Sequence, residues 1–476
     1  MVNLTQKEFD EKKSLKVIFP MFIKINGDEL TPVNIYYKLK GKYKFLLESA
    51  STSKEESRYS FMGSNPYLLL SSRGENVTIT KGNETKETKG KILDYAEGHL
   101  LKEYDRLDLE LPFIGGAIGY IGYDVIRQYE NLPDNNPDEL NLPETCLLFY
   151  KEYICFDHFK NTLMLIHNVF PEEDEDYSTV LDKLNSMESI INEEPVNHEL
   201  TENSQNKEVT SNYTKKDFCD LVNKAKQHIT SGDIFQLVLS QRLKIKNSTD
   251  PFIVYRRLRR SNPSPYMFYI DFEAFKLAGA SPESLVKVKG NQVMTNPIAG
   301  TRPRGETSNE DQKLKEELLN DEKELAEHLM LVDLGRNDIG KISEFGSIKL
   351  DKFMEVEFFS HVMHMCSKVS GTLKSGLNCF DALKSCLPVG TVSGAPKIRA
   401  MELIDELENT RRNIYSGAIG YFSYGGDMDT CIAIRTIVFK DDFAYVQGGA
   451  GIVYDSVPED EYTETLNKTM ALMEVL

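Results

Sequence analysis

Short apolar runs separated by turn residues dominate the first 190 residues of the chain. The runs at 44–48 and 67–71 have the length of strands and predict core strands. The segment 112–120 is apolar and dense in glycine, which predicts a strand that packs closely against another backbone. Later apolar runs predict further strands at 235–243, 275–280, 418–423, 431–439 and 444–447.

Helical periodicity is clearest in the later part of the chain. Thr214 can cap a helix that runs to about Thr230. Phe218, Val222 and Ile229 share one face of this predicted helix. Other periodic segments predict helices at 314–331, 396–407 and 459–473. We predict the α+β class, because strands and helices are both plentiful but do not alternate as they do around a parallel sheet.

A polar segment separates the two parts of the chain. The residues from about 185 to 212 contain few apolar side chains, which is typical of a linker. We therefore predict an N-terminal domain at 1–190, a linker at 191–212 and a C-terminal domain at 213–476.

Composition and charge narrow the possible partners. The 476 residues are 40% hydrophobic and 27% charged, which is enough apolar material for a large core. The net charge of −18 argues against nucleic acid or an anionic membrane surface as the main partner. No apolar stretch approaches the roughly 18 to 20 residues of a membrane span. The seven cysteines are scattered singly without metal-binding spacing, which predicts free thiols and a cytoplasmic protein.

Two pairs of glutamates are candidates for a metal site. Glu324 and Glu327 are three residues apart on a predicted helix, and Glu461 and Glu464 repeat this spacing on the last helix. Four carboxylates that converge from two helices would suit Mg²⁺, which prefers oxygen ligands. Taken alone, each pair is more often a solvated helix face.

Other segments could bind an anion or transfer a proton. The glycines of 447–452 would let backbone N–H groups approach an anion, and 390–397 leads into a helix start at Pro396. Neither has the spacing of a nucleotide-binding motif, and each alone is more often a tight turn. Arg435 in its apolar strand could bind a carboxylate ligand or form a structural ion pair. His364 could transfer a proton or fill a polar gap.

Eight segments, taken together and in order, resemble one enzyme family. They are 46–49, 58–63, 233–242, 262–267, 297–305, 327–338, 390–397 and 429–436. The chain resembles the chorismate-utilising enzymes, most closely the anthranilate synthase component I group. The resemblance implies two large, mostly antiparallel β-sheets packed as a sandwich with helices on the outside.

The resemblance also implies a reaction. Chorismate and ammonia would give aminodeoxyisochorismate, which loses pyruvate to give anthranilate. Gln236 stands where water-using members of the family have a lysine base, and Ala299 stands where aminodeoxychorismate synthases have a lysine that attacks the ring. Both residues favour anthranilate synthase. The alternatives are aminodeoxychorismate synthase component I and a catalytically inactive regulatory subunit that binds tryptophan.

The family's functional residues carry over to positions of this chain. Glu324, Glu327, Glu461 and Glu464 match the Mg²⁺ site. Glu283 matches the candidate general acid, His364 the residue implicated in pyruvate elimination, and Thr391 a further residue at the reacting ring. The predicted substrate-binding residues are Gly300, Thr301, Tyr415, Arg435, Gly449, Gly451 and Lys468. The predicted tryptophan site, which would couple the N-terminal part to the catalytic part, comprises Glu48, Ser49, Pro265, Tyr266, Met267, Ile419 and Tyr421.

A second protein is implied as the source of ammonia. None of the seven cysteines lies in the glycine-flanked turn expected of a glutaminase nucleophile. The resemblance therefore implies a separate glutamine amidotransferase subunit, with free ammonia as an alternative substrate and tryptophan as an inhibitor.

Overall fold

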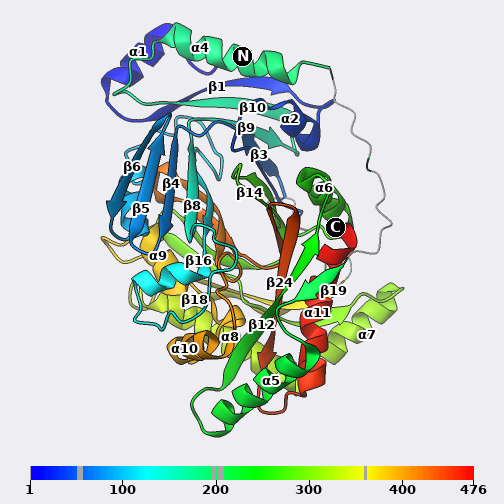
Figure 1. Cartoon of the computed structure of the whole chain (residues 1–476). Helices are drawn as coiled ribbons and strands as arrows, with labels where there is room; N and C mark the ends of the chain where they lie inside the picture. The colour runs from blue at the N-terminus through cyan, green and yellow to red at the C-terminus, as the bar shows by residue number, and fades with distance from the viewer. Residues whose placement is uncertain (1, 51–56, 195–199, 201–207, 359–361) are drawn as a thin grey trace.

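The structure is a computed structural model of the chain, and it describes residues 2–50, 57–194, 200, 208–358 and 362–476. Most of the predicted linker, at 195–199 and 201–207, lies outside the described residues. Two large antiparallel sheets and the helices around them make up the described part (Figure 1). This architecture confirms the predicted α+β class and the predicted pair of sheets.

The first sheet contains strands from both ends of the chain. Its order is β1 (Phe19–Asn26), β10 (Thr162–Val169), β9 (Glu152–Asp157), β3 (Tyr59–Gly63), β2 (Phe45–Glu48), β13 (Tyr266–Asp271), β14 (Phe275–Ser281), β23 (Thr436–Lys440), β24 (Phe443–Ile452), β12 (Gln236–Lys246) and β11 (Val209–Ser211). The short strand β20 (Gly394–Ala395) also pairs with β12.

The second sheet is built in the same way. Its order is β17 (Ile298–Pro303), β19 (Val362–Thr372), β16 (Gln292–Thr295), β15 (Ser284–Lys289), β22 (Met428–Ile432), β21 (Ala418–Ser423), β7 (Gly116–Ile121), β8 (Thr145–Tyr150), β4 (Leu68–Arg73), β5 (Asn76–Lys81) and β6 (Glu84–Lys89). Strand β18 (Lys349–Phe358) pairs with the other side of β19. Because both sheets take strands from either side of the predicted linker, the two predicted domains share their sheets, and the boundary at 191–212 stays a prediction.

The two sheets pack face to face through a shared apolar core. Phe45 and Phe268 of the first sheet belong to the same buried cluster as Ile118 and Leu148 of the second sheet. Alternate side chains of a strand point to opposite faces, so each sheet has a second apolar face that must be covered. Helices cover these outer faces, which gives the predicted sandwich with helices outside.

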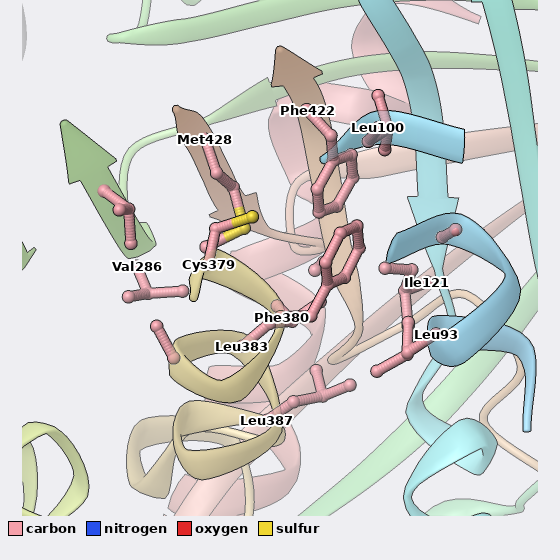
Figure 2. Packing of buried hydrophobic residues seen from close by; sticks show 14 of the residues in the cluster. Leu93, Leu100, Ile121, Val286, Cys379, Phe380, Leu383, Leu387, Phe422 and Met428 are labelled. Atoms are coloured by element: carbon pink, nitrogen blue, oxygen red, sulfur yellow. The ribbon is translucent and has the colours of Figure 1, made fainter. Parts of the chain in front are cut away.

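The outer faces are covered by helices of both chain halves. On the first sheet lie α1 (Gln6–Ser14), α2 (Pro32–Lys38), α4 (Tyr177–Ile191), α6 (Pro251–Ser261) and α11 (Pro458–Val475). On the second sheet, α3 (Ile92–Leu100) and α9 (Cys379–Cys386) bury their apolar faces, as Figure 2 shows. The rings of Phe380 on α9 and Phe422 on β21 stack with centroids 5.6 Å apart. Their contact holds α9 against the sheet.

The glycine-dense strand packs as its sequence predicts. A Cβ atom on Gly119 of β7 would lie 2.0 Å from the carbonyl oxygen of Cys146 on the neighbouring strand β8. No side chain larger than hydrogen fits there, because the clash is with backbone. The capped helix after Thr214 is also confirmed, as α5 (Lys215–Thr230) with a capping box between Thr214 and Asp217.

Three predicted elements differ from the structure. The segment 431–439 is not one strand, because β22 ends at Ile432 and β23 begins at Thr436 in the other sheet. The segment 314–331 is two helices, α7 (Ser308–Leu319) and α8 (Glu322–Gly340), since the side chain of Asp321 caps the N-terminus of α8. The glycines of 448–451 lie inside β24 and not in a loop or tight turn.

The remaining helical predictions hold. The segment 396–407 forms α10 (Lys397–Leu407), preceded by the short helix η2 (Gly390–Val392), and the segment 459–473 lies within α11. All seven cysteines are free thiols. In the described part of the chain, none of the helices combines the length and the apolar character that crossing a membrane requires.

Candidate active site

The predicted site residues come from elements of both sheets and from helices packed beside them. Gly300 and Thr301 lie on β17, His364 on β19, Gly449 and Gly451 on β24, and Thr391 in η2. Glu324 and Glu327 lie on α8, and Glu461, Glu464 and Lys468 on α11. Glu283 lies between β14 and β15, Tyr415 precedes β21, and Arg435 lies between β22 and β23.

Arg435 occupies the segment where the chain crosses from one sheet to the other. Its backbone has φ of 49°, a left-handed conformation that is uncommon for residues other than glycine. Burial lowers the pKa of Arg435, while Tyr415 and the carboxylate of Glu464 raise it. The guanidinium is therefore a largely buried cation close to two other predicted site residues, and it can bind a carboxylate with two parallel hydrogen bonds.

The two glutamate pairs influence one another across α8 and α11. Burial raises the pKa of Glu327, and the charges of Glu324 and Glu464 raise it further. Burial also raises the pKa of Glu461, to which Glu464 adds. The structure thus brings carboxylates of both helices near one another, where their mutual repulsion favours a bound cation.

Basic side chains balance part of this negative charge. Lys468 Nζ lies 2.6 Å from Glu464 Oε1 and donates to the carbonyl oxygen of Gly449 at 3.0 Å. Arg302 lies 3.2 Å from Glu324. Sequence reasoning did not single out Arg302, although it lies in the segment 297–305 that carries the resemblance.

The donor set suits a hard cation. All four candidates are carboxylates, and two of them have raised pKa values in this surrounding. Among the residues that the structure describes, no three His, Cys, Asp or Glu side chains are gathered closely enough to hold a metal ion. The residues fit Mg²⁺ by their chemistry, and the metal site stays a prediction.

Glu283 has the character of an acid that keeps its proton. Burial raises its pKa to about 8, although the neighbouring Thr391 hydroxyl and the charge of Lys468 lower it. The Thr391 hydroxyl is itself buried, and within the described residues it forms no well-aligned hydrogen bond. A buried hydroxyl in this state is available to a ligand.

The glycines of β24 leave room for larger side chains of the site. A Cβ atom on Gly449 would lie 2.7 Å from the hydroxyl oxygen of Tyr415, and one on Gly451 would lie 2.8 Å from Nε2 of Gln236. Gln236 also donates to Glu327 at 3.3 Å. Gly449 and Gly451 therefore adjoin the phenol, the amide and the carboxylates, which supports their prediction as substrate-binding positions.

His364 is a half-buried imidazole on β19. Its Nδ1 lies 2.9 Å from the Thr301 hydroxyl. Burial lowers the pKa of His364, a backbone hydrogen bond at Gly300 raises it, and the charge of Arg435 lowers it. The charge of Arg435 therefore acts on the imidazole of His364.

A separate cavity of about 1460 Å³ lies between the two sheets. It is lined by all seven residues of the predicted tryptophan site, namely Glu48, Ser49, Pro265, Tyr266, Met267, Ile419 and Tyr421. Glu48 accepts hydrogen bonds from Arg259 at 2.8 and 2.9 Å and from the Tyr255 hydroxyl at 2.7 Å. Pro282 and Ser284 line this cavity, so the residues on either side of Glu283 face it.

Comparisons with known proteins agree with this geometry. A family model described as chorismate binding enzyme matches residues 41–474. The anthranilate synthase component 1 of Acetivibrio thermocellus is 46% identical, with 96% of this chain and 95% of the relative covered. That of Aquifex aeolicus is 42% identical, with 100% and 98% covered. The crystal structure of anthranilate synthase component I from Streptococcus pneumoniae is 41% identical, with 94% of this chain and 98% of that chain covered and a TM-score of 0.81.

Proposed function

Because the chain belongs to the family of chorismate-binding enzymes, we propose that it catalyses the anthranilate synthase reaction. Chorismate and ammonia give aminodeoxyisochorismate, which loses pyruvate to leave anthranilate. The observation that carries this proposal is the 46% identity, over nearly the full length of both chains, to a relative of that name. Gln236 and Ala299 support it, since an amide cannot serve as the base that activates water and a methyl group cannot attack the ring.

The site residues suit the binding of a dicarboxylate. Arg435 would bind the enolpyruvyl carboxylate, because a buried guanidinium forms strong bidentate bonds with such a group. Lys468 and the backbone of β24 around Gly449 and Gly451 lie beside the same site and would complete this contact. Tyr415 and Thr301 would line the ring.

Glu283 would act as the acid of the first step. With a pKa of about 8 it is protonated at neutral pH and can give its proton to the 4-hydroxyl of chorismate, which leaves as water. Ammonia forms the new carbon–nitrogen bond to the ring as the carbon–oxygen bond to the 4-hydroxyl breaks. Thr391, whose buried hydroxyl adjoins Glu283, would orient the acid or the leaving group.

His364 would act in the second step. A lowered pKa keeps the imidazole neutral at physiological pH, so it can accept a proton from the ring. The electron pair left behind makes the ring aromatic while the bond between the ring and the enolpyruvyl oxygen breaks. Pyruvate leaves as its enolate with the electrons of that bond, and the enolate then takes up a proton on carbon to give pyruvate.

The carboxylates Glu324, Glu327, Glu461 and Glu464 would hold Mg²⁺. When bound, the ion would supply a positive charge for the ring carboxylate and for the charge that develops as the hydroxyl leaves.

We further propose two partners and a location. The designation "component 1" of the relatives supports a second subunit, and this subunit would be a glutamine amidotransferase that supplies ammonia. Tryptophan inhibits by binding in the cavity between the sheets, whose lining contains every residue of the predicted effector site. The free thiols fit a reducing cytoplasm.

The product of the reaction tests the proposal. Purified protein with chorismate, Mg²⁺ and an ammonium salt at alkaline pH should release fluorescent anthranilate, and tryptophan should suppress it. Aminodeoxychorismate as the product would show that the chain is an aminodeoxychorismate synthase component I. Binding of tryptophan without any turnover of chorismate would show an inactive regulatory subunit.

A further inference from the structure

Arg412 is a fully buried cation outside the set of predicted site residues. Only 2% of it is exposed, and all five of its N–H groups donate hydrogen bonds. Two go to Glu408 at 2.9 and 2.6 Å, and one goes to the hydroxyl of Ser416 at 3.4 Å. The other two go to the backbone carbonyls of Val392 at 2.6 Å and Val238 at 2.8 Å.

Glu408, the partner of this cation, is equally enclosed. It is 4% exposed, and its Oε1 also accepts hydrogen bonds from the backbone N–H and the hydroxyl of Ser240, at 2.9 and 2.8 Å. A buried ion pair contributes little net stability compared with apolar residues of the same volume, because both charges lose their water. The bonds of Arg412 to two backbone carbonyls point instead to a role in fixing the position of those segments.

Two segments that carry predicted site residues, and a strand that pairs with a third such segment, meet at this guanidinium. Val392 follows Thr391 directly, and Val238 lies on β12 opposite Gly451. The guanidinium carbon also lies 5.6 Å from the centroid of the Tyr415 ring. A change in the position of Arg412 would therefore be transmitted to the Thr391 loop, to the pairing of β12 with β24 and to Tyr415.

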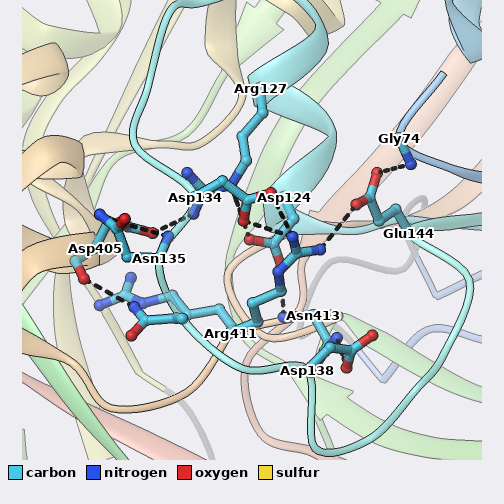
Figure 3. Close-up of polar contacts among 12 residues, drawn as sticks. Gly74, Asp124, Arg127, Asp134, Asn135, Asp138, Glu144, Asp405, Arg411 and Asn413 are labelled. Carbon is cyan, nitrogen blue, oxygen red and sulfur yellow. Dashed lines mark hydrogen bonds and ion pairs between the residues drawn. The ribbon is translucent and has the colours of Figure 1, made fainter.

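The backbone around Arg412 is held independently of its side chain. Its neighbour Arg411 forms ion pairs with Asp134 and Glu144, and the backbone N–H of Asn413 donates to Asp124 at 2.9 Å (Figure 3). These contacts anchor the segment to the connection between β7 and β8. Substitutions of Arg412 should therefore disturb the segments whose carbonyls its side chain binds, and they should leave the backbone around residue 412 in place.

We propose that Arg412, clamped by Glu408, is a positioning residue that holds the Val392 carbonyl and thereby sets the Thr391 hydroxyl beside Glu283. The inference rests on the proposed function, in which Glu283 is the acid of the first step. Arg412 acts through Thr391 and does not touch the substrate. Replacing Arg412 should therefore lower the rate of the chemical step. It should leave the binding of tryptophan in the cavity between the sheets unchanged.

A double-mutant cycle tests this coupling. Arg412→Lys and Thr391→Val should each lower kcat for anthranilate by about 10- to 100-fold, and the double variant should be no slower than the slower single variant. Arg411→Lys is the matched control, because it weakens the partly exposed ion pairs of the adjacent residue without touching Val392. It should lower the melting temperature and leave kcat near that of the wild type.

The possible results separate the two proposals. If the fold losses of kcat in Arg412→Lys and Thr391→Val multiply in the double variant, the positioning role is wrong. It is also wrong if Arg411→Lys loses as much kcat as Arg412→Lys does. If Arg412→Lys does not fold, Glu408→Gln releases the same guanidinium and takes its place in the cycle. A wild-type protein that makes no anthranilate would refute the proposed function itself, whereas an active wild type with additive variants refutes only the role of Arg412.

Discussion

The hydroxyl oxygen of Thr301 on β17 lies 2.9 Å from Nδ1 of His364, the residue paired with it on β19. The two strands thus bring a hydroxyl and a half-buried imidazole together at one register position. A hydrogen bond to one ring nitrogen restrains the orientation of the imidazole. We infer that Thr301 orients His364 as well as lining the ring site.

Removing the Thr301 hydroxyl should impair the step that His364 carries out. We expect Thr301→Val to lower kcat by about 10- to 100-fold, because the valine is similar in shape but cannot hydrogen-bond. Thr301→Ser keeps the hydroxyl and should stay close to the wild type. Steady-state anthranilate fluorescence measures both. Equal rates for the valine and serine variants would show that the hydroxyl does not orient His364.

The acid role of Glu283 predicts the pH dependence of the rate. Because burial raises its pKa to about 8, kcat should fall as the pH rises through that value and the acid loses its proton. The assay must hold the concentration of free ammonia constant across the series. Glu283→Gln should lower kcat by about 10²- to 10⁴-fold and abolish this decline. If kcat of Glu283→Gln falls with rising pH as it does in the wild type, the fall is due to another titrating group.

The same carboxyl also makes stability depend on pH. Its folded-state pKa of about 8 lies above the ordinary value of 4.5, so between these values the folded protein binds more protons than the unfolded chain. Stability contributed by this group is therefore complete below about 4.5 and is lost as the pH rises to about 8. The melting temperature of Glu283→Gln relative to the wild type should rise across this range. A difference that stays constant with pH would contradict the assignment.

The local elements could be predicted from the sequence because their signals are local. Thr214 with Asp217 marks the start of α5, and the glycine spacing marks the closely packed strand β7. The break between α7 and α8 also has a local signal, because Asp321 is a good capping residue. The apolar periodicity continues across Asp321, however, and it predicts a single helix. The helix break leaves Glu324 in the first turn of α8, still on the same face as Glu327.

The assembly of the site could not be predicted from local patterns. Residues 431–439 are predicted as one strand because only Arg435 and Thr436 interrupt their apolar run, yet the chain leaves one sheet at Ile432 and enters the other at Thr436. The turn is made at Arg435 with a positive φ, which hydrophobic periodicity does not encode. Strand order depends on pairing between residues far apart in the chain, so the position of Arg435 beside Tyr415 followed only from the resemblance and the structure.

The proposed Mg²⁺ site predicts a loss of activity on removal of the metal. A chelator should abolish anthranilate formation, and added Mg²⁺ should restore it. Glu327→Gln should abolish turnover that depends on Mg²⁺, because it removes a buried charged ligand. Glu322→Gln, on the exposed surface of the first turn of the same helix, is the control and should stay active. Activity of Glu327→Gln that still responds to Mg²⁺ would contradict the metal assignment.

Filling the cavity between the sheets should remove the proposed feedback inhibition. Ser49 is half-buried and lines this cavity, so the phenyl ring of Ser49→Phe would occupy space that an indole needs. We expect tryptophan to bind at least about tenfold more weakly, a loss of about 1.4 kcal/mol, while kcat without tryptophan stays unchanged.

Titration calorimetry with tryptophan, alongside inhibition curves, separates binding from its effect on the rate. The cavity is also lined by Pro282 and Ser284, so we expect tryptophan bound there to act on the rate through the segment that carries Glu283. If Ser49→Phe keeps the affinity of the wild type for tryptophan, the effector lies elsewhere. If the variant binds tryptophan as the wild type does but is no longer inhibited, Ser49 belongs to the coupling and not to the binding site.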